Sequence, residues 1–221
     1  PRAFCATASH VGNIDRRGSN PAGVRKTMAE PELRCIDSRV VYKNRWMTVR
    51  EDRVRRLSGE DGLFGIVDKP DFSLIVPFDG ERFHLVQQYR YPVDGRYWEF
   101  PQGSLEGEPD ASAEQVATVE LQEETGVIAG RLEPLGRLFQ AYGYCNQGVH
   151  VFLATGLQEG LANPETAEQG MISGAFTRQE CEAMIDEGSI ADLATLAAFY
   201  LFDRHARRSR GENVAGMQTS L

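Results

Sequence analysis

Residues 103–127 read GSLEGEPDASAEQVATVELQEETGV, and this acidic segment contains the clearest helix signal in the chain. Asp110, after Pro109, can cap a helix, and Gly126 supplies the left-handed residue that ends one, so a helix is predicted over residues 111–125. Between residues 106 and 130 there are seven acidic residues and no Lys or Arg. The excess of acidic residues in this segment, without any basic residue, therefore needs a chemical explanation.

Glu120 lies three and four positions before Glu123 and Glu124, so the three carboxylates share one side of the predicted helix. Like charges at these spacings repel, and anions near a helix C-terminus oppose the helix dipole. A bound divalent cation would relieve both effects, and an all-oxygen ligand set favours Mg²⁺, with Mn²⁺ as a substitute. The alternative is a solvated acidic face that pairs with distant arginines such as Arg131.

Around this helix, short β-branched and aromatic runs predict strands, and two more helices are expected near the C-terminus. Strands before and after one central helix predict an α/β fold in which helices cover both faces of a mixed sheet. The predicted strands and C-terminal helices span residues 40–42, 46–57, 64–67, 72–78, 83–91, 138–144, 149–154, 171–176, 178–187 and 190–204. The polar ends predict a disordered leader over residues 1–34, or a natural start at Met28, a domain over 35–206 and a flexible tail over 207–221.

The bulk composition limits the partners of this chain. Its 221 residues are 41% hydrophobic and carry a net charge of −8, which argues against nucleic acid or an anionic membrane as a partner. No run approaches the ~18 apolar residues of a membrane span. The four cysteines form no Cys-x-x-Cys pair, and no export signal precedes them, so a cytoplasmic location is expected.

Gly103-Ser-Leu-Glu-Gly-Glu108 followed by Glu120-Leu-Gln-Glu-Glu-Thr-Gly-Val127 resembles the signature of the Nudix hydrolases. A wider likeness to the ADP-ribose pyrophosphatase branch covers residues 39–202. It includes Leu85-Val-Gln-Gln-Tyr-Arg-Tyr-Pro92, Trp98-Glu-Phe-Pro-Gln-Gly103 and Gly188-Ser-Ile-Ala-Asp-Leu-Ala-Thr-Leu196. The resemblance implies a Nudix α/β/α sandwich and a homodimer that pairs through its N-terminal strands, residues 35–68. It also implies Mg²⁺-dependent hydrolysis of ADP-ribose to AMP and ribose 5-phosphate.

The resemblance also implies roles for particular residues. Glu120, Glu123, Glu124 and the main-chain carbonyl of Gln102 would bind the metal. Glu168, with its neighbour Glu165 as the alternative, would contribute a further ligand and activate water. The expected catalytic residues are Glu120, Glu124 and Glu168.

This chain departs from the family pattern at three places. Val119 replaces an arginine, and the loop before the helix is two residues longer, with Pro109 in place of a glutamate. The proline typical of ADP-ribose enzymes is absent from residues 140–145. These departures keep two other activities open: a dinucleoside polyphosphate or nucleotide-sugar pyrophosphatase, and a non-catalytic nucleotide sensor.

Several residues outside the acidic helix are candidates for contacting a small nucleoside diphosphate derivative. Arg90 and Arg96 suit phosphate oxygens, although surface or ion-pair roles are equally expected. Glu99, in an otherwise apolar strand, binds substrate or metal, or else belongs to a structural ion pair. Trp46 is the preferred aromatic for stacking on a nucleobase, against the more common role of such residues in cores.

Overall fold

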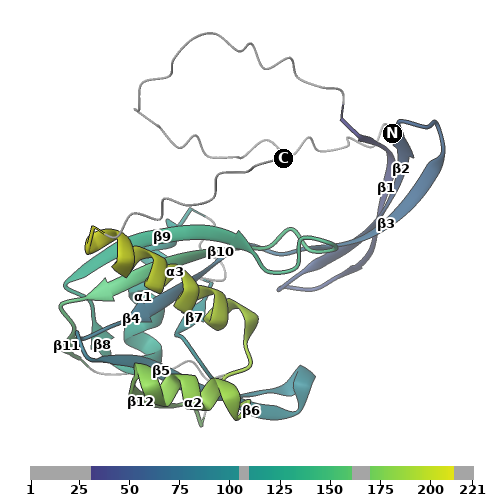
Figure 1. Ribbon diagram of the computed structural model, residues 1–221. Helices are drawn as coiled ribbons and strands as arrows, with labels where there is room; N and C mark the ends of the chain where they lie inside the picture. The colour runs from purple at the N-terminus through teal and green to yellow at the C-terminus, as the bar shows by residue number, and fades with distance from the viewer. Residues whose placement is uncertain (1–30, 105–109, 161–169, 212–221) are drawn as a thin grey trace. The chain divides into compact units, whose positions relative to one another are not determined.

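Figure 1 shows the computed structural model of the protein, which describes residues 31–104, 110–160 and 170–211. The chain divides into two compact units, Pro1–Asp68 and Lys69–Leu221. In the described part of the chain, no helix has the length and apolar character needed to cross a membrane. Each unit is described by itself below.

The first unit is a three-stranded antiparallel sheet in which β2 is the central strand. Its strands are β1 (Leu33–Lys43), β2 (Thr48–Arg56) and β3 (Asp61–Asp68). Opposite charges face each other across the strands: Arg39 pairs with Glu51 at 2.9 Å and Arg55 with Asp61 at 2.6 Å. Such pairs favour one register over its neighbours.

The second unit contains two sheets and three α-helices among its described residues. One sheet has the order β7-β4-β10-β9 and the other β12-β5-β6, and a two-stranded ribbon joins β8 and β11. The elements are β4 (Phe72–Pro77), β5 (Arg82–Arg90), η1 (Tyr91–Val93), β6 (Gly95–Glu99), β7 (Gln102–Gly103), α1 (Ala113–Thr125), β8 (Val127–Ile128), β9 (Arg131–Phe139), β10 (Gly148–Thr155), β11 (Gln158–Glu159), β12 (Ile172–Thr177), α2 (Arg178–Asp186) and α3 (Leu193–Ser209).

Strand β4 is buried on both faces and explains the layered arrangement. Leu74 and Val76 point to one side, where they pack in a cluster that includes Phe199 of α3. Ile75 points to the other side and packs against Leu121 of α1. Because β4 and β10 are parallel while their outer neighbours are antiparallel, the sheet is mixed. The predicted α/β/α sandwich with a mixed sheet between helices is confirmed.

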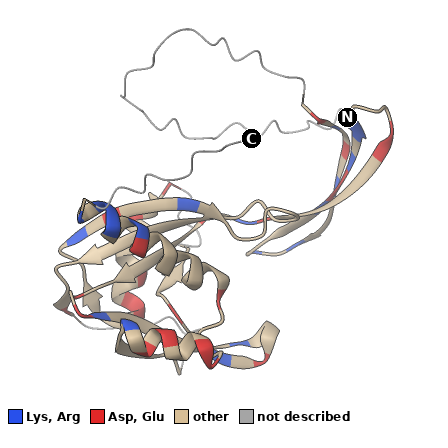
Figure 2. Cartoon of the chain, viewed as in Figure 1, with Lys and Arg blue, Asp and Glu red and all other residues tan. Residues whose placement is uncertain are grey.

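Several element boundaries differ from the sequence prediction. Strand β1 spans Leu33–Lys43, although only residues 40–42 were predicted as a strand and the predicted leader extended to residue 34. Strand β9 spans Arg131–Phe139 instead of the predicted 138–144, and Pro134 and Gly136 lie in the part that was not predicted. The sheet tolerates Pro134 because β9 is an edge strand, where a proline needs no ladder partner on its open side. Helix α3 continues to Ser209, beyond the predicted domain end at residue 206. Arg207 and Arg208 occupy its last turn, where cations complement the helix dipole (Figure 2).

Candidate active site

Helix α1 positions the acidic residues, and its start is set by a reciprocal cap. The Ser112 hydroxyl accepts a hydrogen bond from the Gln115 main-chain N–H, and the Gln115 side chain accepts one from the Ser112 N–H. This capping box makes Ser112 the N-cap, so the prediction of Asp110 was wrong by two residues. The predicted stop is confirmed, because Gly126 adopts φ 71°.

The buried side of α1 carries two rows of side chains. Ala117 and Leu121 form the apolar row that packs on the sheet. Glu120 and Glu124, also one turn apart, are only 7% and 5% exposed. Glu123 is half-buried. The sequence prediction placed all three carboxylates on one side, and the structure separates two buried carboxylates from one that is partly open to solvent.

The short strand β7 runs directly beside Glu120 and Glu124. The Gln102 main-chain N–H donates a hydrogen bond to the Glu124 carboxylate at 3.1 Å. At Gly103, even a methyl side chain would overlap the Glu120 carboxylate. A side chain at residue 103 would therefore displace the Glu120 carboxylate, and the close approach of β7 brings both carboxylates to one stretch of backbone.

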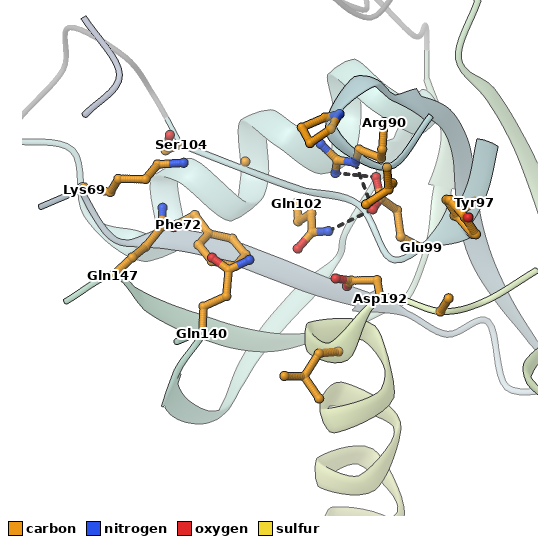
Figure 3. A pocket seen from close by; sticks show the side chains of 15 residues that line it. Lys69, Phe72, Arg90, Tyr97, Glu99, Gln102, Ser104, Gln140, Gln147 and Asp192 are labelled. Carbon is orange, nitrogen blue, oxygen red and sulfur yellow. Dashed lines mark hydrogen bonds and ion pairs between the residues drawn. The ribbon is translucent and has the colours of Figure 1, made fainter. Parts of the chain in front are cut away.

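A cavity of about 720 Å³ opens beside β7, within the range of small-molecule sites (Figure 3). Its wall includes Gln102 and Gly103, so it adjoins the α1 carboxylates. Figure 3 shows charged and amide side chains around it. The lining residues are Lys69, Phe72, Arg90, Pro92, Val93, Tyr97, Glu99, Gln102, Gly103, Ser104, Gln140, Gln147, Ala191, Asp192 and Leu193.

Glu99 is 3% exposed and forms the centre of a polar network in the cavity wall. Its carboxylate accepts hydrogen bonds from Arg90, from the Gln88 amide at 2.8 Å and from the Gln102 amide at 3.2 Å. Burial raises the pKa of Glu99, and the Arg90 guanidinium opposes that shift. Of the two roles left open for Glu99, this geometry favours the ion pair with Arg90, and both residues face the cavity.

The other predicted site residues lie elsewhere or outside the described residues. Arg96 does not line the cavity, because it donates hydrogen bonds to the main-chain oxygens of Gln87 and Gly170 at 3.1 and 2.6 Å. Trp46 belongs to the first unit, where it is 47% exposed and the Arg45 guanidinium lies 4.1 Å from its ring centre. Glu165 and Glu168 fall outside the described residues.

The sequence prediction missed most of the residues that line the cavity, among them Lys69, Phe72, Gln140, Gln147 and Asp192. Lys69, Phe72, Gln140 and Gln147 carry no local signal, because they come together only when the ends of β4, β9 and β10 are aligned. Asp192, in contrast, carried a local sequence signal. Its carboxylate caps α3 by accepting a hydrogen bond from the Thr195 N–H at 2.8 Å. An acidic residue directly before an apolar helix is a recognisable N-cap signal.

The chemistry of the α1 carboxylates fits a divalent cation. Glu120 and Glu124 offer buried carboxylate oxygens, and Gly103 places no side chain against the Glu120 carboxylate. Among the described residues, no three or more Asp, Glu, His or Cys side chains are arranged to hold a metal ion. Of the predicted ligand set, Gln102, Glu120, Glu123 and Glu124 lie among the described residues, and Glu168 lies outside them.

Two family models match the chain. The NUDIX domain model covers residues 69–193, more than half of the chain, and the model of the nucleoside diphosphate sugar hydrolase N-terminal domain covers residues 34–67. The chain belongs to the Nudix family. This Nudix chain is 31% identical over 175 residues to an ADP-ribose pyrophosphatase of Mycobacterium tuberculosis, which covers 77% of this chain and 83% of that protein.

Other relatives agree with this assignment. An ADP-ribose pyrophosphatase of Bacillus subtilis is 29% identical over 129 residues, 58% of this chain and 68% of that protein. A methanol dehydrogenase activator of Bacillus methanolicus is 27% identical over 129 residues, 58% of this chain and 69% of that protein. The crystal structure of an ADP compounds hydrolase matches with a TM-score of 0.72 and 18% identity, over 83% of this chain and 98% of that one, and shares the fold. The predicted resemblance is confirmed: the chain is a Nudix hydrolase similar to ADP-ribose pyrophosphatases.

Proposed function

We propose that this Nudix hydrolase cleaves the pyrophosphate bond of ADP-ribose to give AMP and ribose 5-phosphate, with Mg²⁺ as its cofactor. The observation that carries the proposal is the placement of Glu120 and Glu124. Both carboxylates are buried, lie one turn apart on α1, and adjoin the backbone of β7 in the wall of the cavity. The names of the relatives support ADP-ribose as the substrate.

The reaction needs a nucleophile and neutralisation of the diphosphate charge. A water oxygen forms a bond to one phosphorus, the bond from that phosphorus to the bridging oxygen breaks, and the bridging oxygen leaves with the other phosphate. When bound, Mg²⁺ would neutralise phosphate oxygens and acidify water.

The chain's own residues would supply the rest. Glu120 and Glu124 would hold the ion, with Glu123 and the Gln102 carbonyl as the other proposed ligands, and Gly103 leaves space for the phosphates. Glu168 is proposed to ligate the metal and to accept the proton of the attacking water.

Replacing Glu124 by Gln tests the metal site directly. We expect turnover to fall by at least ~100-fold, because a ligand should matter more than the surrounding groups whose loss costs 10–100-fold. The matched control is Glu114→Gln, which removes an exposed carboxylate from the first turn of the same helix. AMP release should depend on added Mg²⁺ and stop with a chelator. Activity of Glu124→Gln within a few-fold of the wild type would contradict the assignment.

A second substrate class is favoured by the N-terminal family model, whose description names nucleoside diphosphate sugars in general. A panel of ADP-ribose, ADP-glucose, UDP-glucose and a diadenosine polyphosphate, each assayed with Mg²⁺, separates the candidates by their kcat/KM values. ADP-ribose should give the highest value. Binding of these compounds without turnover would favour the nucleotide sensor that Val119 left open.

We further propose that two copies of the chain pair through the N-terminal sheet. Its strands carry large apolar side chains that are exposed in the single chain, including Leu63 at 64% and Val40 at 57%. Large apolar side chains that are exposed in this way are common at protein–protein interfaces. The cytoplasm remains the expected location.

A further inference from the structure

Lys69 lies at the side of the cavity opposite Arg90 (Figure 3). We propose that the Lys69 ammonium group binds phosphate oxygens of the substrate, as the main cationic contact that the second unit offers. This inference rests on the proposed function for the class of ligand, a nucleoside diphosphate derivative. The charged side chains that line the cavity support this role.

Among the residues that the structure describes, four charged side chains line the cavity: Lys69, Arg90, Glu99 and Asp192. The Arg90 guanidinium donates two hydrogen bonds to the Glu99 carboxylate, at 2.5 and 3.2 Å, so its charge is balanced within the wall. Asp192 adds a negative charge. Among residues 31–104, 110–160 and 170–211, the Lys69 ammonium group has neither a hydrogen-bond nor an ion-pair partner.

The backbone around Lys69 is anchored, so the Cα atom of Lys69 has a defined place in the cavity wall. The Lys69 main-chain N–H donates to the Asn146 side-chain oxygen at 3.1 Å. The Gln147 amide donates to the Pro70 carbonyl at 2.8 Å, and the Gly148 N–H donates to the Asp71 carboxylate at 2.7 Å. These bonds join residues 69–71 to the start of β10 and fix one wall of the cavity.

A diphosphate that enters this cavity also approaches the Glu120 and Glu124 carboxylates, which are buried beside β7. Lys69, on the side of the cavity opposite Arg90, supplies a positive charge, and an ammonium group binds phosphate oxygens as a compact point charge. Lys69 is therefore a binding residue that acts on the affinity for substrate and takes no part in bond cleavage.

The test compares Lys69→Met with Lys69→Arg, which keeps the charge. We expect Lys69→Met to raise the KM for ADP-ribose, and its Kd by calorimetry, about tenfold while kcat stays within a few-fold, because hydrogen bonds to charged groups contribute most to affinity. Lys69→Arg should restore most of the loss. Arg208→Met, which removes an exposed cation outside the cavity, controls for net charge. Thermal unfolding establishes that each variant folds.

The outcomes separate this inference from the proposed function. Equal ADP-ribose affinity of Lys69→Met and wild type, an equal loss in Arg208→Met, or no ADP-ribose binding to the wild type would each overturn the role of Lys69. If Lys69→Met binds ADP-ribose more weakly than the wild type, but the wild type releases no AMP, the binding role of Lys69 would be supported and the proposed hydrolysis would be overturned.

Discussion

The two units of this chain hold their strands together in different ways. In the second unit, all six residues of β4 are buried, and apolar side chains pack on both of its faces. In the first unit, β1 has no buried residue, and Val54 is the only buried apolar residue that the structure describes there. A fully buried Leu or Phe contributes roughly 1.5–3 kcal/mol, whereas an exposed ion pair contributes roughly 0–1 kcal/mol.

The first sheet therefore has little buried apolar surface of its own among its described residues, while the second unit contains its own core. Ion pairs such as Arg55–Asp61 specify the register of the first sheet but contribute little energy. Small sheets in general need a covered apolar face to be stable. The exposed apolar residues of β1 and β3 are the observation behind the proposed pairing of two copies.

The largest effect on stability should come from Leu74→Ala in β4. Leu74 is fully buried, so the loss of its side chain should lower the free energy of unfolding by about 2–5 kcal/mol at any protein concentration. Leu63→Ala in β3 should weaken the dimer in sedimentation experiments and lower stability only at concentrations where the chain dimerises. A concentration-independent loss in both variants would show that the two units are stabilised alike.

Two glycine substitutions, one in each unit, compare the effect of an added methyl group on turnover. Gly103→Ala places a methyl group on the Glu120 carboxylate, so the carboxylate must move and kcat should fall by about tenfold or more, since small misplacements at a reacting centre are costly. Gly65→Ala in β3 has no heavy atom within 4 Å of the new methyl group and should leave kcat unchanged. If both variants release AMP at the same rate, the close approach of Gly103 to Glu120 is not needed for catalysis.

The smallest effect concerns acid stability. Burial acts to raise the pKa of Asp71, but hydrogen bonds from Gly148 and Arg137 outweigh it, so the pKa lies below the usual value of an aspartate. The carboxylate therefore stabilises the fold above its unfolded-state pKa, and that contribution is lost as the pH falls through the lowered value. Asp71→Asn should be less stable than wild type at pH 7, and the difference should shrink below about pH 4.

Asp61 provides the control for Asp71. The Arg55 hydrogen bond lowers the pKa of Asp61 as well, but this carboxylate is exposed to solvent. Asp61→Asn should therefore change the urea midpoint little at any pH, because exposed pairs are screened. A pH-independent difference between Asp71→Asn and wild type would contradict the role of its ionised form.

Glu99 shows where prediction from the sequence reached its limit. An acidic residue inside an apolar strand was recognisable as unusual, but its two interpretations could not be separated. The partner Arg90 lies nine residues away on the neighbouring strand. In the register of β5 against β6 Glu99 is opposite Val86, so the pair also depends on the reach of the Arg90 side chain along the sheet. Register is a pairwise property of strands, and one strand's sequence does not define it.

The sequence by itself determined the reaction class and the acidic helix, because helix caps, carboxylate spacing and a signature with many fixed positions are all local. Residues 103–127 were sufficient for these conclusions, apart from the identity of the N-cap. Only the tertiary structure decided which carboxylates are buried, that Glu99 pairs with Arg90, and that Lys69 faces the same cavity. The physical reason is that a cavity wall is assembled by packing elements distant in sequence, and burial is a property of that packing.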